Sequence, residues 1–185
     1  MARVELPALR STIMDSPGGC ELTIPAKRNF FAVAFLGFWT IGWACGEVFA
    51  IRQLFFEVKG ENFPAIFLMA WLGAWTVGGV VAIYTWLWMV VGKERIVLKP
   101  ATLSIQRDVL GFGKIREYDL NHVANLRLSP QTYNPFDMSS SLRFWGIGGG
   151  LVAFDYGAKT FRFGGSIDEA EAQNIINELN KRHKF

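Results

Sequence analysis

Residues 64–92 contain no charged side chain, and this uncharged run ends at Lys93. A membrane-spanning helix needs about 20 consecutive apolar residues, each of which adds about 1.5 Å to its length. A helix of the 29 residues in this run would extend about 43 Å, whereas the hydrocarbon core of a bilayer is about 30 Å thick. The sequence therefore predicts a transmembrane helix over 64–92 that tilts, kinks near Gly78 or projects beyond the bilayer surface.

A second apolar run, at residues 30–51, precedes this one and is separated from it by a polar and aromatic link at 52–63. Proline is tolerated in the first turn of a helix, so a helix that begins at Pro64 is expected. The first 29 residues contain charged side chains and no early apolar core, so we expect the run at 30–51 to be a retained anchor rather than a cleaved signal peptide. The two runs together predict a transmembrane hairpin over 30–92.

Lysine and arginine are more frequent beside the outer ends of this predicted hairpin than in its link. The flanks contain Lys27, Arg28, Lys93, Arg95 and Lys99, and the link contains Arg52 and Lys59. Short segments rich in lysine and arginine stay on the cytoplasmic side of a membrane. We therefore expect both termini in the cytoplasm.

The composition outside the hairpin is that of an ordinary folded domain. Hydrophobic residues make up 51% of the chain and charged residues 19%, and the apolar excess is concentrated in 30–92. Residues 93–185 contain 13 Lys and Arg against 10 Asp and Glu, which is too even a balance for a nucleic-acid-binding surface. Cys20 and Cys45 lie in segments expected on different sides of the membrane surface, so we expect no disulfide framework. Neither cysteine has a metal-ligating neighbour in the sequence, and we expect no metal and no cofactor.

After Lys93 the sequence alternates between apolar and polar residues, with turn residues in between, which is typical of half-buried strands. We expect strands at 95–99, 102–108, 114–119, 123–128, 142–145, 151–156 and 160–163, and a hairpin turn marked by Gly111 and Gly113. Residues 20–25 alternate in the same way, whereas residues 1–19 are mixed and turn-rich.

A C-terminal helix is predicted over 167–182. The Ser166 hydroxyl can cap its first turn while Glu169 reaches back, which makes a capping box. Apolar residues then recur at helical spacing, at Ala172, Ile175, Ile176 and Leu179. Acidic residues at the start and basic residues at the end suit the helix dipole.

Seven short strands followed by one amphipathic helix is the element order of a pleckstrin-homology-like (PH-like) barrel. Three stretches carry a wider resemblance: LTIPAKRNFFAVAFLGFW at Leu22–Trp39, GKERIVL at Gly92–Leu98 and FRFGGSIDEAEAQNIINEL at Phe161–Leu179. In these stretches the chain resembles small bacterial membrane proteins that have two transmembrane helices and a C-terminal PH-like domain. Members of that group mostly have no assigned activity, so the resemblance transfers no functional residue.

The resemblance implies an α+β protein of the bacterial cytoplasmic (inner) membrane, with a two-helix transmembrane hairpin followed by a PH-like antiparallel β-barrel or sandwich. Residues 1–29 would be a cytoplasmic segment, and its strand at 20–25 would join the later barrel as an edge strand. Residues 93–185 would be the cytoplasmic PH-like domain.

Small and aromatic residues are spaced along single faces of the two predicted helices. Gly42 and Gly46 form a GxxxG motif, and Ala74 and Gly78 continue a small-residue stripe on the second helix. Trp39 with Trp43, and Trp71 with Trp75, are each four residues apart and so share a face. Small residues let membrane helices approach closely. These eight positions are expected either to pack the two helices on each other or to contact a partner helix, and the tryptophans are also candidates for contact with lipid or pigment.

Glu47 is the one ionisable residue inside the run at 30–51. A carboxylate at membrane depth is costly and is often functional. However, Glu47 lies about 26 Å along the helix, near the far interface where water is within reach. A role in proton or ion transfer is a minor alternative.

Four basic residues are expected to form a collar at one membrane surface: Lys27, Arg28, Lys93 and Arg95. Each such charge contributes about 1 kcal/mol to the attraction of anionic lipid. The same residues serve equally well as the orientation signal alone. Membrane lipid is thus one expected partner.

No catalytic triad, paired carboxylates or metal-binding spacing is visible in the sequence. We therefore expect a non-enzymatic protein, an accessory or scaffolding subunit of a larger membrane complex, for which a photosynthetic or respiratory assembly is a candidate host. Its other partners would be membrane protein subunits and not nucleic acid. A membrane-anchored PH-like sensor of lipid or peptide is the alternative, and a small transporter or enzyme component is the second alternative.

Overall fold

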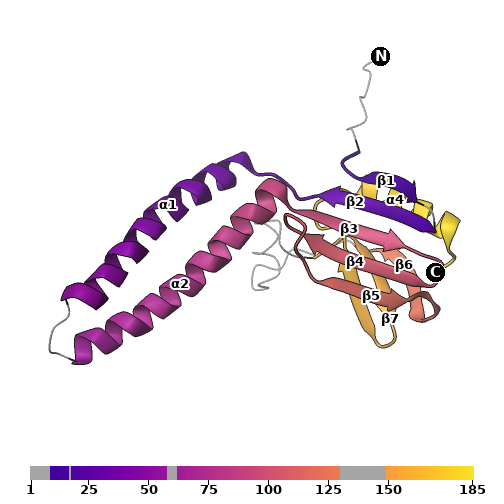
Figure 1. Cartoon of the computed structure of the whole chain (residues 1–185). Helices are drawn as coiled ribbons and strands as arrows, with labels where there is room; N and C mark the ends of the chain where they lie inside the picture. The colour runs from indigo at the N-terminus through magenta and orange to yellow at the C-terminus, as the bar shows by residue number, and fades with distance from the viewer. Residues whose placement is uncertain (1–8, 17, 58–61, 130–148) are drawn as a thin grey trace, which may run out of the picture. The chain divides into compact units, whose positions relative to one another are not determined.

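A computed structural model describes residues 9–16, 18–57, 62–129 and 149–185 (Figure 1). The chain divides into two compact units. One, the helical hairpin, spans Arg28–Val90. The other, the sheet unit, combines Met1–Lys27 with Val91–Phe185. The segment before the first helix therefore belongs to the same unit as the C-terminal part of the chain.

The helical hairpin consists of α1 at Phe30–Arg52, a π-helical turn at Gln53–Glu57 and α2 at Asn62–Val91. Asn29 caps α1, because its side-chain oxygen accepts a hydrogen bond from the backbone N–H of Ala32 at 3.2 Å. The bounds lie within two residues of the expected 30–51 and 64–92. The π-helical turn has no counterpart in the sequence prediction.

Both helices are long and apolar enough to cross a membrane. In the most apolar stretch of each, only 11% and 6% of the residues are buried. The core helix of a soluble protein would have most of its apolar side chains buried. The exposure of α1 and α2 therefore favours an apolar solvent around them.

The sheet unit contains two antiparallel sheets. The first has the order β1-β2-β3-β4-β5 and the second has the order β6-β7-β8. The first comprises β1 Thr12–Ser16, β2 Gly19–Pro25, β3 Lys93–Leu98, β4 Thr102–Asp108 and β5 Ile115–Asp119. The second comprises β6 Val123–Leu128, β7 Val152–Tyr156 and β8 Lys159–Phe163. In the residues that the structure describes, neither sheet closes into the barrel expected from the sequence.

Six of the seven strands expected after Lys93 are present. The strand expected at 142–145 lies outside the described residues. The strand at 20–25, expected as an edge strand, is interior, because β1 pairs with it along the side away from β3. β1 itself lies in the segment predicted to be turn-rich, so that prediction is wrong for 12–16.

β2 and β3 are neighbours in the first sheet, although the whole helical hairpin lies between them in the sequence. Their register pairs Pro25 with Lys93. The pairing continues one step further, where the backbone N–H of Ala26 donates to the carbonyl oxygen of Gly92 at 2.9 Å. The chain therefore enters α1 and returns from α2 at the same end of this sheet.

The C-terminal helix α4, at Glu169–Arg182, begins two residues later than expected. Its cap is Asp168, whose carboxylate accepts the N–H of Glu171 at 2.8 Å. The predicted capping box at Ser166 is wrong, because the Ser166 hydroxyl instead accepts the N–H of Lys27 at 3.0 Å. Aspartate is an equally good cap and also suits the helix dipole.

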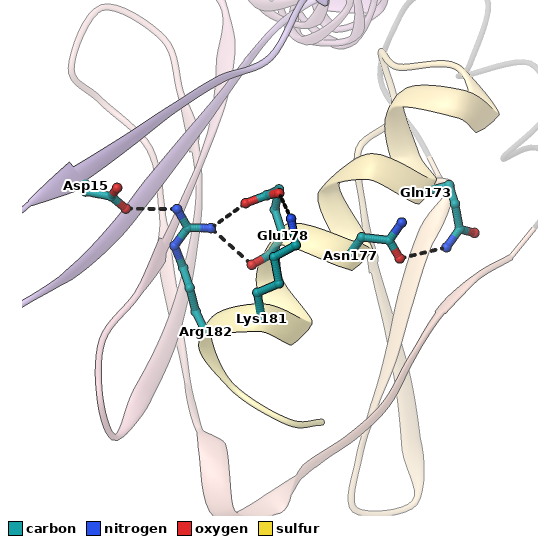
Figure 2. A network of polar contacts seen from close by, with 6 residues as sticks. All are labelled: Asp15, Gln173, Asn177, Glu178, Lys181 and Arg182. Atoms are coloured by element: carbon teal, nitrogen blue, oxygen red, sulfur yellow. Dashed lines mark hydrogen bonds and ion pairs between the residues drawn. The ribbon is translucent and has the colours of Figure 1, made fainter.

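Polar contacts attach α4 to the N-terminal strand (Figure 2). The Arg182 guanidinium lies 3.0 Å from a carboxylate oxygen of Asp15 and 3.0 Å from one of Glu178. Hydrogen bonds to these two carboxylates raise the pKa of Arg182. The buried carboxylate of Glu171 accepts the N–H of Ser11 at 2.6 Å. These contacts explain why a segment without strand-like alternation forms β1.

One apolar core lies between the two sheets and α4. β2 and β3 contribute every second residue to it, as expected for strands with one buried face. Phe154 and Phe163 of the second sheet and Ile175 of α4 are fully buried in the same cluster. Cys20 also lies there, and burial raises the pKa of its thiol, which makes it a poor nucleophile.

Glu94 is a charged residue on the buried face of β3, only 6% exposed. One of its carboxylate oxygens accepts the N–H of Gly164 at 2.7 Å. The other accepts from the guanidinium of Arg107 at 3.4 Å. Because Gly164 follows β8, this carboxylate ties the first sheet to the second.

The variant Glu94→Ala should reduce the local stability of the sheet unit by about 2 kcal/mol, because it leaves the Gly164 N–H buried without an acceptor. Hydrogen exchange of peptides from β3 and β8, measured by mass spectrometry on the full chain in detergent, would report the loss of protection. Glu117→Ala, which removes an exposed carboxylate of β5, is the matched control. Equal protection in the two variants would contradict the assignment.

Candidate functional site: a tryptophan-lined groove in the helical hairpin

Two tryptophan–glycine contacts hold α1 and α2 together. The indole N–H of Trp43 on α1 donates to the carbonyl oxygen of Trp75 on α2 at 3.2 Å. The Trp43 ring also occupies the space that a β-carbon on Gly79 would fill. Any side chain at position 79 would therefore displace the ring.

The second contact repeats the first with the helices exchanged. The indole N–H of Trp86 on α2 donates to the carbonyl oxygen of Val33 on α1 at 3.0 Å. Its nitrogen would lie 3.1 Å from a β-carbon on Gly37. The acceptor residue precedes the glycine by four in both contacts. A helical side chain covers the carbonyl four residues before it, so a glycine leaves that carbonyl open to the indole.

A groove runs beside the first contact. It has a volume of about 300 Å³ and is lined by Trp39, Trp43, Trp71, Ala74, Trp75 and Gly78. Trp71 and Trp75 stack with their ring centroids 4.7 Å apart. Six of the eight positions predicted from the sequence therefore line one groove.

The predicted glycines differ in what surrounds them. A β-carbon on Gly42 or on Gly78 would meet nothing within 4 Å, and both residues are exposed. A β-carbon on Gly46 would lie 3.9 Å from the Trp75 ring. The glycines at the closest approach of the helices, Gly37 and Gly79, were missed by the GxxxG pattern. Aligning the two predicted helices as an antiparallel hairpin, and asking which glycine lies opposite each tryptophan, could have identified Gly37 and Gly79.

Glu47 is hydrogen-bonded inside the hairpin rather than free. The Thr76 hydroxyl donates to one of its carboxylate oxygens at 2.6 Å. The other oxygen is buried and has no donor among the described residues. The indole nitrogen of Trp75 is also buried and has no acceptor among them. These two atoms are the unsatisfied polar groups near the groove lining.

The four residues of the expected basic collar fall into two pairs. Lys27 and Arg28 are exposed. Lys93 lies 3.5 Å from the buried carboxylate of Asp108, and Arg95 lies 3.8 Å from it. The Arg95 guanidinium also lies 2.7 Å from a carboxylate oxygen of Glu21. Lys93 and Arg95 thus serve ion pairs within the sheet unit, which weakens their expected role in lipid binding.

A second polar cluster lies on the sheet β6-β7-β8. The Arg127 guanidinium makes two hydrogen bonds with the Asp155 carboxylate, at 2.8 and 3.0 Å. Thr160 and Asn125 donate to the same carboxylate. These bonds, that of Arg127 first, hold the pKa of Asp155 well below its usual range. The four groups satisfy one another, so the cluster stabilises the strand irregularity at Asn125 and leaves little to hold a ligand.

No protein-family model matches the chain, and comparisons with curated proteins and with solved structures also gave no match. Within the described ranges, no group of three or more His, Cys, Asp or Glu residues is placed to hold a metal ion.

Gly79→Leu should destabilise the hairpin by roughly 1–3 kcal/mol, because the new side chain displaces the Trp43 ring. Gly78→Leu should leave it unchanged, because position 78 has open space around it. Six of the seven tryptophans lie in α1 and α2, so the thermal shift of tryptophan emission in detergent reports mainly on the hairpin. A similar midpoint for the two variants would contradict the contact.

Arg127→Met should raise the pKa of Asp155 toward the ordinary value of about 3.9. Because the folded pKa is lowered, the ion pair stabilises the fold at neutral pH, and this contribution is lost as the pH falls below about 4. A carboxyl ¹³C NMR titration of the full chain would measure the change. Arg162→Met, at an exposed arginine of β8, should leave the Asp155 titration where it is, and a shift there would contradict the assignment.

Proposed function

We propose that the protein is a non-catalytic accessory or scaffolding subunit of a larger membrane protein complex. Both helices cross the bilayer, and the groove lined by Trp39, Trp43, Trp71, Ala74, Trp75 and Gly78 receives a transmembrane helix of another subunit. The observation that carries the proposal is this groove, because four of its lining residues, Trp39, Trp71, Ala74 and Gly78, take no part in the two tryptophan–glycine contacts between α1 and α2.

The groove is suited to a helix because its small residues are accessible. Lipid supplies no hydrophobic drive for association, so membrane helices associate through close packing at small residues. Gly78 has open space where a side chain would be, and Ala74 is exposed beside it. Gly42 is similarly open on α1. The glycines that hold the hairpin together are different ones, so these remain available to a partner.

Polar chemistry favours a protein helix over lipid tails as the occupant. The Trp75 indole nitrogen lacks an acceptor and one oxygen of Glu47 lacks a donor, among the described residues. An unpaired polar atom in hydrocarbon is costly. A hydroxyl or amide side chain of a partner helix could accept from the Trp75 indole N–H after a small shift of the Trp71 ring that stacks on it, whereas acyl chains could not.

The rest of the proposal concerns location. In the proposed arrangement the hairpin lies in the inner membrane of a bacterial cell with both termini in the cytoplasm, and the basic residues at the outer ends of the hairpin support this orientation. Two antiparallel sheets that share a core with a C-terminal helix are compatible with a PH-like domain. A photosynthetic or respiratory assembly is a suitable host, because such complexes contain many small, non-catalytic membrane subunits.

The subunit role predicts that association with a partner depends on Gly78, although the stability of the hairpin does not. The tagged protein purified from native membranes in mild detergent should bring a second protein with it at fixed stoichiometry, as measured by native mass spectrometry. Gly78→Leu should abolish this association, because the new side chain fills the groove.

Val80→Leu provides the matched control. Val80 is 60% exposed and lies about 200° around the helix from position 78, so it faces away from the groove. Association that survives Gly78→Leu, or a mass that corresponds only to copies of this chain, would contradict the proposal.

A further inference from the structure

The turn between β4 and β5 has an unusual residue at its tip. Leu110 and Gly111 have φ angles of 55° and 88°, as in the two-residue turns in which both central residues are left-handed. Glycine, asparagine and aspartate adopt this conformation readily, whereas a left-handed leucine costs about 1–2 kcal/mol. A leucine there needs a compensating role.

Packing among the residues that the structure describes does not supply this compensation. Leu110 is 64% exposed, Phe112 is 81% exposed and Ile115 is 55% exposed. These three side chains, here called the apolar tip, lie within six consecutive residues of one hairpin. Large apolar residues exposed together mark a surface that contacts something apolar.

The apolar tip is held in a fixed conformation. Val109 and Phe112 exchange two backbone hydrogen bonds, at 2.8 and 2.9 Å. The buried Asp108 carboxylate accepts the N–H of Gly111 at 2.7 Å, and its other oxygen lies near the cationic group of Lys93. Lys93, predicted as a lipid contact, therefore supports the turn.

The register of the sheet gives the end at which the tip lies. Lys93 at the start of β3 pairs with Asp108 at the end of β4, and with Pro25 at the end of β2. The turn at Leu110 therefore projects from the end of the sheet where the chain enters α1 and leaves α2. The opposite end carries the β3–β4 turn at Ala101.

Cationic side chains flank the apolar tip. Lys114, just before β5, and Arg116, on β5, are both exposed. Lys27, just beyond the end of β2, is exposed at the same end of the sheet. Apolar side chains bordered by cations suit the headgroup region of an anionic bilayer, where apolar groups enter the acyl boundary and cations contact phosphate.

We infer that Leu110, Phe112 and Ile115 form a wedge that inserts into the surface of the bilayer crossed by α1 and α2. The inference rests on the proposed membrane location of the hairpin and adds a second, peripheral contact between the sheet unit and lipid. Burial of the apolar tip in lipid supplies the compensation for the left-handed leucine that the fold itself does not.

The test places a fluorescent label beside the tip without altering it. The full chain carries Cys45→Ala and Lys114→Cys, and a polarity-sensitive thiol dye is attached at position 114, since the buried Cys20 should not react. The protein is reconstituted singly in nanodiscs of phosphatidylcholine and phosphatidylglycerol that contain a lipid with a nitroxide quencher near its headgroup. Quenching measures contact of the dye with lipid.

Three comparisons show whether the quenching at position 114 depends on the apolar tip. A dye at Ala101→Cys, an exposed position at the other end of the sheet, should show no quenching. The double variant Leu110→Ser with Phe112→Ser should lose the quenching at position 114. Leu110→Asn should lower the quenching while leaving hydrogen-exchange protection of β4 and β5 equal or higher, because asparagine accepts the left-handed conformation.

Equal quenching at positions 114 and 101 would overturn the inference. So would quenching at 114 that persists in the double serine variant, because proximity to the helices alone would then explain it. Because each nanodisc contains a single copy of the protein, contact of the apolar tip with a second copy cannot explain the quenching. If the quenching test fails, the co-purification of a partner and its dependence on Gly78 are unaffected. If Gly78→Leu does not abolish co-purification, the expected quenching at position 114 is unaffected. The two experiments therefore test the subunit role and the membrane wedge separately.

Discussion

The pairing of β2 with β3 is the constraint on which the rest of the structure depends. The two strands flank the helical hairpin in the sequence and are hydrogen-bonded neighbours from Cys20–Leu98 to Pro25–Lys93. This pairing holds the start of α1 close to the end of α2, so the two helices run antiparallel. The same pairing makes β2, which precedes the hairpin in the sequence, an integral part of the sheet unit.

The hairpin divides its glycines and tryptophans between two tasks. Gly37 and Gly79 each leave open the carbonyl four residues earlier, and Trp86 and Trp43 bind these carbonyls. Close approach and hydrogen bonding thereby replace the hydrophobic drive that is missing between helices in lipid. Gly42, Gly73 and Gly78 are instead left open. Under the proposed function, this division allows a partner to occupy the groove without weakening the hairpin.

The sequence predicted elements whose signal is local. β4 and β6 have the expected bounds, because alternation with period two and nearby turn residues fix a strand. β1 was missed because its strand conformation comes from pairing with β2 and from Arg182, which is distant in sequence. The tryptophan pairs and the Ala74–Gly78 stripe identified the groove. The GxxxG pattern identified neither Gly37 nor Gly79, because spacing within one helix does not show which glycine faces the other helix.

Cysteine accessibility in membranes tests the central claim, that the chain crosses the bilayer twice and keeps the whole sheet unit on one side. Single cysteines at Ser11, Ala158 and Lys59, in a Cys45→Ala background, would be exposed to a membrane-impermeant thiol reagent in intact cells and after lysis. The account predicts that Ser11→Cys and Ala158→Cys react only after lysis, whereas Lys59→Cys, in the segment that links α1 and α2, reacts in intact cells. Reaction of all three under the same condition would contradict the account.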